Sequence, residues 1–316
     1  MTKRSLTIVF AAIVSVVPVG AAKAGADMLD PGKLRLASAN AVVYDTAAER
    51  RLYAKAADEV TPIASLTKLM TAIVVLDAKQ PMDELLEIDT DDFDFLKGSH
   101  SRLRMGSTLS RREMLRLALM SSENRAASSL ARHYPGGATA AVAAMNRKAM
   151  SLGMTRTHYS DPTGLSADNV SSANDLAKLV VVAAQYPTIR EYSTTPAHSV
   201  EIQPTGHLLG FNNSNALVKN TAWDIQLQKT GYIREAGKCL VMLTNIASRP
   251  LVIVLLDSYG KYTRLGDAQR IKHWVETGEG LSVPAAQGGR QSGTFPPRAK
   301  VKTASRAPKP QAARRV

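Results

Sequence analysis

The placement of apolar periods along the chain constrains its fold more than any other feature of the sequence. Ala41–Tyr44 and Arg51–Tyr53 flank a polar turn near the start of the body, and residues 239–246 and 251–257 are β-rich runs near its end. Each pair predicts a β-hairpin. The long middle has mainly helical periodicity. These features predict an α+β fold, in which both chain ends build one antiparallel sheet flanked by helices, with a helical insert at roughly residues 80–200.

The helical pattern has recognisable starts and stops. A Ser110–Glu113 capping box and Ser172 paired with Asp175 each predict a helix start. Two segments rich in acidic residues or Asn, residues 83–94 and 210–222, have no clear period and predict irregular structure. We therefore expect helices at residues 65–78, 110–132, 138–151, 172–186 and 264–276.

The formal net charge of +13 comes from the two ends of the 316-residue chain. Residues 1–24 hold three Lys and Arg and residues 287–316 hold eight, whereas all 27 acidic residues lie between them. The 29 basic residues of the body leave it a formal charge of +2. The body therefore has no net basic excess of the kind that nucleic-acid binding usually requires, and we expect no nucleic-acid partner.

Both ends predict segments outside the folded body. Lys3 and Arg4, an apolar run over residues 6–19 and small residues at 22–24 are typical of a secretory signal peptide over residues 1–24. The apolar run is short for a membrane span. Residues 284–316 are rich in Pro, Gly, Ala, Lys and Arg, which predicts a disordered basic tail. The tail is either a solvated extension or a weak contact with anionic envelope polymers.

Ser65-Leu-Thr-Lys68 is the first motif that carries chemistry. At a helix start, side chains three residues apart share a face. Ser65 could simply cap the helix, but a cap does not explain Lys68, whose charge opposes the helix dipole. That field, together with burial, lowers the pKa of an amine, so that a neutral Lys68 could take the proton of Ser65. Ser258-Tyr-Gly-Lys261 has the same spacing, but it follows a strand and does not open a helix.

Two further motifs complete an ordered set. Lys229-Thr230-Gly231 follows a strand-like run, and its Lys and Thr can hold a carboxylate where Gly allows close approach. Ser122-Glu-Asn124 interrupts a helical segment with polar residues. Ser38-Ala-Asn40 also matches Ser-x-Asn but precedes Ser65, and Ser172-Ala-Asn174 contains a residue that already caps a helix.

The three motifs in this order resemble those of penicillin-binding proteins and class A β-lactamases. With Asp161-Pro-Thr-Gly-Leu165 and Lys229-Thr-Gly-Tyr232, residues 34–277 are most similar to the low-molecular-weight D-alanyl-D-alanine peptidases, in particular to the endopeptidase subgroup. The resemblance implies the serine β-lactamase/DD-peptidase fold, with residues 25–283 as catalytic domain. It also implies a periplasmic or otherwise exported peptidoglycan hydrolase, inhibited by β-lactam antibiotics.

The resemblance also implies a role for each motif residue. Ser65 would form the acyl-enzyme, Lys68 would accept its proton, Ser122 would relay a proton to the leaving amine and Asn124 would orient Lys68. Lys229, Thr230, Gly231 and Tyr232 would bind substrate, with the backbone N–H groups of Ser65 and Tyr232 as the oxyanion hole. No metal or cofactor is expected, because the single Cys239 and the scattered histidines lack metal-site spacing.

Three alternatives stay open from the sequence. A D-alanyl-D-alanine carboxypeptidase would remove a terminal residue and leave cross-links intact. A class A-like β-lactamase would need an added carboxylate base, for which Asp161 or Glu191 could be nominated without a motif. An inactive wall-binding protein could retain the fold, but it would have no reason to keep the complete catalytic set.

Overall fold

The computed structural model describes residues 29–94, 97–98 and 100–283. The predicted signal peptide and basic tail lie outside the described residues. The described strands are β1 (Asn40–Asp45), β2 (Arg50–Lys55), β3 (Thr61–Pro62), β4 (Leu85–Glu87), β5 (Thr108–Ser110), β6 (Val170–Ser171), β7 (Ala197–Ile202), β8 (His207–Asn212), β9 (Asp224–Ile233), β10 (Gly237–Ile246) and β11 (Arg249–Ser258). The helices are α1 (Lys68–Asp77), α2 (Arg111–Met120), α3 (Asn124–Arg132), α4 (Gly137–Ser151), α5 (Ala173–Ala183), α6 (Pro187–Thr194) and α7 (Thr263–Thr277).

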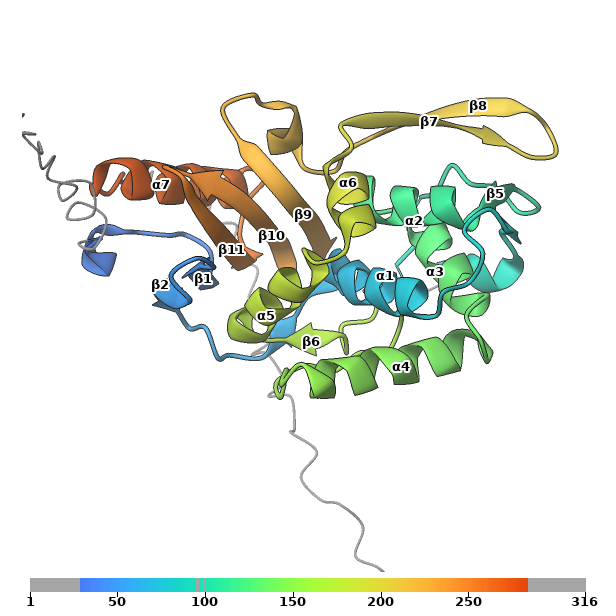
Figure 1. The fold of residues 1–316 in the computed structure, drawn as a ribbon, viewed down its shortest axis with the longest axis horizontal. Helices are drawn as coiled ribbons and strands as arrows, with labels where there is room; N and C mark the ends of the chain where they lie inside the picture. Colours follow the sequence, from blue (N-terminus) through green and yellow to red (C-terminus); the bar gives the residue numbers. More distant parts are fainter. Residues whose placement is uncertain (1–28, 95–96, 99, 284–316) are drawn as a thin grey trace, which may run out of the picture. The chain divides into compact units, whose positions relative to one another are not determined.

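One antiparallel sheet joins the two ends of the body, as predicted. Its strand order is β2-β1-β11-β10-β9 (Figure 1). The N-terminal hairpin enters the sheet through β1, which pairs with β11 so that Val42 lies opposite Val254. The C-terminal hairpin supplies β10 and β11, and the α+β class is confirmed.

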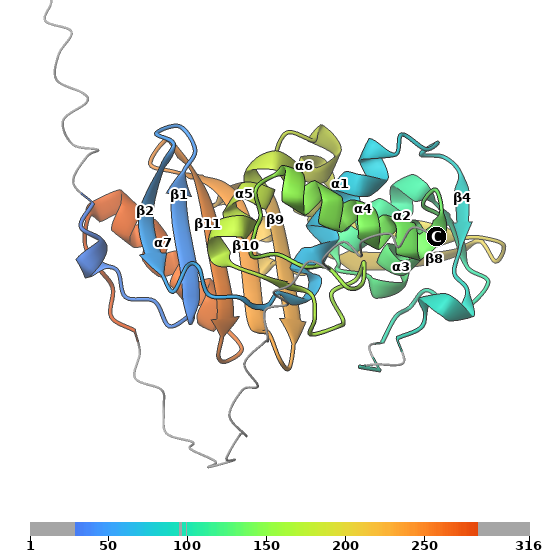
Figure 2. The ribbon, with the colours of Figure 1, turned by 90° about the horizontal axis from the view of Figure 1, so that it is seen from below.

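The alternating side chains of the central strands fill two cores. Val241 and Val254 face the larger core, which also contains α1 and α5, whereas Leu240 and Ile253 face a smaller core closed by α7. Figure 2 shows α7 and α5 on opposite sides of the sheet. Trp274 on α7 is fully buried in the smaller core.

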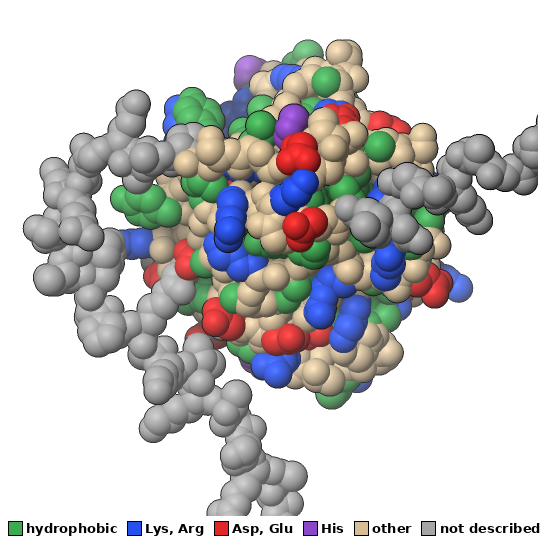
Figure 3. All heavy atoms as spheres, turned by 90° about the vertical axis from the view of Figure 1, so that its left-hand side faces the viewer, with side chains coloured by type: hydrophobic (Ala, Val, Ile, Leu, Met, Phe, Trp, Pro, Cys, Tyr) green, Lys and Arg blue, Asp and Glu red, His purple; other side chains and the backbone are tan. Residues whose placement is uncertain are grey.

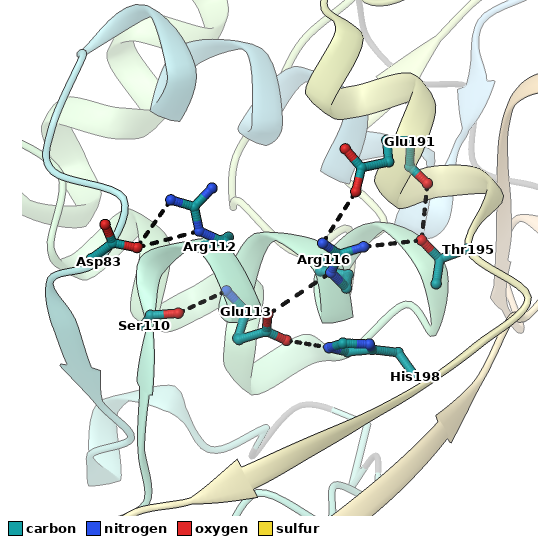
Figure 4. Close-up of polar contacts among 8 residues, drawn as sticks. All are labelled: Asp83, Ser110, Arg112, Glu113, Arg116, Glu191, Thr195 and His198. Atoms are coloured by element: carbon teal, nitrogen blue, oxygen red, sulfur yellow. Dashed lines mark hydrogen bonds and ion pairs between the residues drawn. The ribbon is translucent and has the colours of Figure 1, made fainter.

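The helices α1 to α4, together with α6, form a helical part beside β9 (Figure 1). Ser110 caps the start of α2 as predicted, because its hydroxyl accepts a hydrogen bond from the Glu113 N–H. A complete capping box would also have the Glu113 carboxylate accept from the Ser110 N–H. That part of the prediction is wrong, because the Glu113 carboxylate instead contacts His198 on β7 at 2.6 Å. Figure 4 shows this contact, and beside it Arg116 binding Glu191 and Thr195, so polar contacts tie α2 to α6 and β7.

Three local predictions need correction. The helix expected over residues 172–186 ends at Ala183, and a second helix, α6, begins at Pro187, a residue that favours a first helical turn. Residues 210–222 are not all loop, because β8 extends to Asn212 and pairs with β7. Residues 83–94 contain the short strand β4, which pairs with β5.

One face of the described surface is mixed in charge. On the face that lies at the left of Figure 1, basic and acidic side chains are interspersed (Figure 3). None of the helices in the described part of the chain combines the length and apolar character that crossing a membrane would require.

Candidate active site

Ser65 lies in a tight turn between strand β3 and helix α1. Residues Ala64–Thr67 form a 3-10 helix, and the α-helix begins only at Lys68. The prediction that Ser65 begins the α-helix is therefore wrong by three residues, and the capping alternative finds no support because neither helix has a side-chain cap. Ala64 has a φ of 48°, an unusual value that turns the chain sharply just before Ser65.

Lys68 is buried with its amine surrounded by oxygen atoms. Its Nζ lies 3.0 Å from Ser65 Oγ, 2.7 Å from Asn124 Oδ1 and 2.7 Å from the Thr163 carbonyl oxygen. The residue is only 1% exposed. Burial lowers the pKa of Lys68 to about 7, against the opposing fields of Asp161 and Glu123. Near neutral pH its amine can therefore lose its charge and accept a proton from the adjacent hydroxyl.

The Ser122-Glu-Asn124 motif occupies the junction of two helices. Helix α2 ends at Met120 and α3 begins at Asn124, with Glu123 as the residue that caps α3. Ser122 has a φ of 64°, so the backbone reverses there. The reversal brings Asn124 to Lys68 and Ser122 to Lys229, as the contacts of both residues show.

The other two Ser-x-Asn matches lie elsewhere. Ser172 accepts a hydrogen bond from the Asp175 N–H and begins α5, which confirms its structural role. Ser38 donates to Asp267 of α7 on the far side of the sheet. Of the three matches, the structure brings only Ser122-Glu-Asn124 to Lys68.

A second buried lysine reaches the site from the large sheet. Lys229 is fully buried, and its Nζ lies 2.8 Å from Ser122 Oγ. Burial holds the pKa of Lys229 well below its usual range, and the nearby charges of Lys68 and Arg264 lower it further. The neighbouring Thr230 hydroxyl lies 2.7 Å from the hydroxyl of Ser214. The site thus holds two buried amines, each in contact with a serine hydroxyl.

Strand β9 continues through this motif, although the motif was predicted to lie at the end of a strand-like run. It extends to Ile233 and forms the free edge of the sheet, beside the turn that holds Ser65. A Cβ added at Gly231 would lie 3.0 Å from the Ile63 carbonyl oxygen and 3.1 Å from the Ser65 nitrogen. Glycine therefore allows the strand to approach Ser65 closely. The next residue, Tyr232, is 60% exposed.

A rigid loop closes the site behind Lys68. The Asp161 carboxylate accepts hydrogen bonds from the N–H groups of Thr163, Gly164 and Ser166 at 2.6 to 2.9 Å. It also accepts from the Thr163 hydroxyl and from the Asn169 side chain, each at 2.6 Å. These contacts hold the Thr163 carbonyl against Lys68 and the Gly164 backbone against Ala64.

Comparisons with known proteins agree with this geometry. Residues 27–260 match the model of a family described as D-alanyl-D-alanine carboxypeptidase, peptidase family S11. The chain belongs to this family. It is therefore a serine DD-peptidase, as the motifs predicted, and the family resemblance and enzyme class are confirmed.

Two relatives are similar over most of their length. The D-alanyl-D-alanine endopeptidase of Pseudomonas aeruginosa is 52% identical, over 81% of this chain and 83% of its own. The enzyme of the same name from Escherichia coli K12 is 50% identical, over 79% and 81%. A carboxypeptidase of Bacillus subtilis is 29% identical over 64% of this chain and 52% of its own.

Solved structures share the fold of this DD-peptidase. The Streptomyces K15 DD-transpeptidase superposes with a TM-score of 0.72 at 27% identity, over 77% of this chain and 98% of that one. Penicillin-binding protein D2 of Listeria monocytogenes, in its cefotaxime-bound form, gives a TM-score of 0.67 at 28% identity with the same coverage.

Sequence reasoning missed several groups of this DD-peptidase site. The roles of Asp161, Asn169 and the Thr163 carbonyl did not emerge, although Asp161-Pro-Thr-Gly had been identified as a loop within the family resemblance. A carboxylate followed by Pro and Gly is a signal for a tight turn, but nothing in it says which carbonyl will face a lysine. Ser214, which contacts Thr230, carries no motif.

Proposed function

We propose that Ser65 is the nucleophile of this DD-peptidase and Lys68 its general base. Ser65 Oγ attacks the carbonyl carbon of a D-alanyl bond as its proton passes to the Lys68 amine. The C–N bond then breaks, the leaving amine takes up a proton, and an ester on Ser65 remains for water to hydrolyse. The 3.0 Å contact between Lys68 Nζ and Ser65 Oγ is the observation that carries this proposal. Burial lowers the pKa of Lys68 to about 7, which supports its role as a base near neutral pH.

Ser122 and Asn124 serve the proton transfers in this proposal. Ser122 Oγ accepts a hydrogen bond from Lys229, so its own proton is free to be donated toward the leaving amine. Asn124 Oδ1 accepts from Lys68 and thereby fixes the direction of the Lys68 amine. Both assignments rest on contacts made within the buried site, where a hydrogen bond is stronger than in water.

The strand β9 supplies the proposed substrate contacts. Lys229 and Thr230 hold the substrate carboxylate, and Gly231 leaves space for the substrate backbone. The N–H groups of Ser65 and Tyr232 form the oxyanion hole, which stabilises the charge that develops on the carbonyl oxygen. A bound carboxylate would favour the charged form of Lys229, against the burial that lowers its pKa in the free enzyme.

D-alanyl cross-links of peptidoglycan are the proposed substrate, which makes the enzyme an endopeptidase. This choice is supported by the two relatives of that name, at 52% and 50% identity over about four fifths of the chain. Carboxypeptidase activity on a terminal D-alanine is the second candidate, favoured by the description of the matched family. β-Lactam antibiotics are the proposed covalent inhibitors.

Product analysis tests the substrate. Purified enzyme is incubated separately with cross-linked muropeptides and with monomeric pentapeptide, with and without penicillin. An endopeptidase separates the cross-linked dimers in a penicillin-sensitive reaction, and release of D-alanine from pentapeptide with intact dimers would identify a carboxypeptidase instead.

Replacing Ser65 with Ala should lower turnover by orders of magnitude and abolish covalent penicillin labelling. Labelled Ser65→Ala protein would refute the assignment of the nucleophile.

A β-lactamase reaction is a weaker candidate on the geometry of its proposed bases. The Asp161 carboxylate is occupied by hydrogen bonds within its own loop. Glu191 lies on α6 and pairs with Arg116. Rapid turnover of bound penicillin would favour the β-lactamase, and a long-lived adduct excludes it. An inactive wall-binding protein would take up no label at all.

The proposed location of the enzyme is the periplasm or another extracytoplasmic space. The predicted signal peptide supports this proposal, and the predicted basic tail would add at most a peripheral contact with the envelope. Deletion of residues 287–316 tests the tail. The truncated protein should be released from envelope fractions at lower salt than the full chain, and equal retention across salt concentrations would dispose of the contact.

A further inference from the structure

Three tyrosine side chains near the active site are exposed to solvent. Tyr232 follows Gly231 on β9, and Tyr259 and Tyr262 lie in the short loop between β11 and α7. They are 60%, 89% and 65% exposed, respectively. Single exposed apolar residues are common on protein surfaces, but a group of large aromatic side chains beside a catalytic site is typical of a binding surface.

Strand pairing places the segments that carry these tyrosines next to each other. Lys238 on β10 lies opposite Tyr232 on one side and Ser258 on the other, and Tyr259 follows Ser258 directly. The Lys238 ammonium lies 4.2 Å from the centre of the Tyr232 ring. Arg264, two residues after Tyr262, donates to the Gly231 carbonyl oxygen at 3.1 Å. The loop and the site strand therefore lie next to each other at this end of the sheet.

The loop that carries two of the rings is held at both ends. The Thr263 hydroxyl donates to the Tyr259 carbonyl oxygen, and the Leu265 and Gly266 N–H groups donate to the Tyr262 carbonyl oxygen at 3.0 and 2.9 Å. Because the backbone is tied to the first turn of α7, ordering it costs little entropy when a ligand binds.

A lysine lies over each of two of the three rings, Tyr232 and Tyr262. Lys261 Nζ lies 5.2 Å from the centre of the Tyr262 ring. Burial lowers the pKa of Lys238, and the nearby charges of Arg264 and Lys261 lower it further. The carboxylate of Glu235, in the adjacent turn, is paired with Lys97 at 2.5 Å. We call Tyr232, Lys238, Tyr259, Lys261 and Tyr262 the tyrosine ledge.

We propose that the tyrosine ledge binds the saccharide strand of peptidoglycan, with its lysines facing the carboxylates of the attached peptide. An aromatic face packs well against the apolar face of a sugar ring, because the ring gives a large rigid contact at small entropic cost. Lysine ammonium groups pair with carboxylates. This inference rests on the proposed function, and it adds a second contact through which the polymer is held while its peptide occupies the catalytic site.

The test measures polymer binding separately from chemistry. In a Ser65→Ala background, which removes turnover, co-sedimentation with purified peptidoglycan gives an apparent dissociation constant. The double variant Tyr259→Ala/Tyr262→Ala should bind roughly tenfold more weakly, by analogy with aromatic stacking on nucleic-acid bases. Tyr259→Phe/Tyr262→Phe keeps both rings and should bind like the parent. Met150→Ala is the matched control, since Met150 is equally exposed but lies on α4.

Competitors distinguish the two parts of the ligand. A soluble β-1,4-linked N-acetylglucosamine oligosaccharide should displace the parent from peptidoglycan, whereas polyglutamate alone should compete only weakly. With Ser65 restored, the double alanine variant should acylate with penicillin at the parental rate and show an elevated KM only for polymeric substrate.

Several results would overturn the ledge. The first is unchanged peptidoglycan binding by the double alanine variant, and the second is competition by polyglutamate but not by the oligosaccharide. The third is slower acylation of the double alanine variant by penicillin, because penicillin is too small a molecule to reach the ledge from the catalytic site. Failure of the parental enzyme to react with penicillin would count against the proposed function instead, because the binding assay does not depend on Ser65.

Discussion

Proton exchange at the Lys68 amine sets how the reaction should depend on pH. Burial lowers the pKa of Lys68 from 10.5 to about 7, so the base is neutral above this pH and charged below it. The rate of acylation by a fluorescent penicillin should therefore rise through pH 7 and level off above it, falling about tenfold per pH unit on the acid side. Stopped-flow labelling from pH 5 to 9 measures the profile. A flat rate over this range would contradict the role of Lys68.

Asp161 should shift that profile through both its charge and its hydrogen bonds. Its carboxylate is the strongest of the fields that raise the pKa of Lys68, so Asp161→Asn should move the acid limb to lower pH. The same variant turns an amide N–H₂ toward N–H donors of the loop, which should loosen the Thr163 carbonyl and lower the plateau rate roughly 10- to 100-fold.

Asp168→Asn is the matched control for Asp161. Asp168 lies in the same loop but its side chain is exposed, and the variant should keep both the plateau and the acid limb of the parent. Pulse labelling at several pH values, with thermal unfolding to confirm folding, measures both variants. An acid limb that stays in place while only the plateau falls would limit Asp161 to a structural role.

Two glycines, Gly164 and Gly231, bring their backbone close to the turn that carries Ser65. Gly164 has a φ of 82°, and a Cβ there would overlap the Ala64 carbonyl group. Gly164→Ala should therefore destabilise the fold by about 3 kcal/mol or more, since backbone must move in addition to the left-handed strain. It should also slow acylation, because Ser65 moves with Ala64.

A substitution at Gly153 separates the backbone clash from the left-handed strain in the destabilisation expected for Gly164→Ala. It also has a positive φ, 65°, but no atom lies within 4 Å of an added Cβ. Gly153→Ala should cost only about 1 kcal/mol, the penalty for the left-handed conformation, and leave acylation unchanged. Urea unfolding followed by circular dichroism gives both values. Equal costs at the two positions would show that the contact with Ala64 does not matter.

The elements also show how far sequence could predict this molecule. Hairpins at both ends were predictable because alternation and turn residues act locally. The same pattern predicted that both hairpins join one sheet, but it did not predict that β1 pairs with β11. The β7–β8 hairpin was missed because β8, with the sequence His-Leu-Leu-Gly-Phe-Asn, does not alternate between apolar and polar residues and contains Gly210. The contact of β7 with α2 is polar and distant in sequence.

In the candidate site, too, features carried by sequence motifs were predictable, and backbone contacts between distant segments were not. The motif spacing predicted that Ser65 and Lys68 share a face, and the ordered set predicted that Ser122 and Lys229 join them. The Thr163 carbonyl could not be foreseen, since a backbone oxygen has no residue signature and its direction depends on five hydrogen bonds to Asp161. The 3-10 helix before α1 was equally unforeseen, because it lies where the backbone of Gly164, a hundred residues along the chain, packs against Ala64, and the Ser65 motif carries no sign of that contact.

At the scale of the whole molecule, the central strands connect the active site to the far side of the sheet. β10 sends Val241 toward the larger core that contains α1 and Leu240 toward the smaller core that contains Trp274. Lys229 lies opposite Val241 in the pairing of β9 with β10. Loss of packing beneath α7 should therefore destabilise the site without touching it, because the two cores share the same strands.

Trp274→Ala tests this coupling. The fully buried indole also donates a hydrogen bond to the Asp30 carbonyl oxygen, and its removal should cost about 3–5 kcal/mol. Circular dichroism in urea and pulse labelling with penicillin should give unfolding midpoints that fall together, while the acylation rate of the folded variant in the absence of urea stays near that of the parent. If labelling persisted at urea concentrations where the dichroism signal had already fallen, the two cores would unfold independently, and the sheet would be a scaffold whose faces are energetically separate.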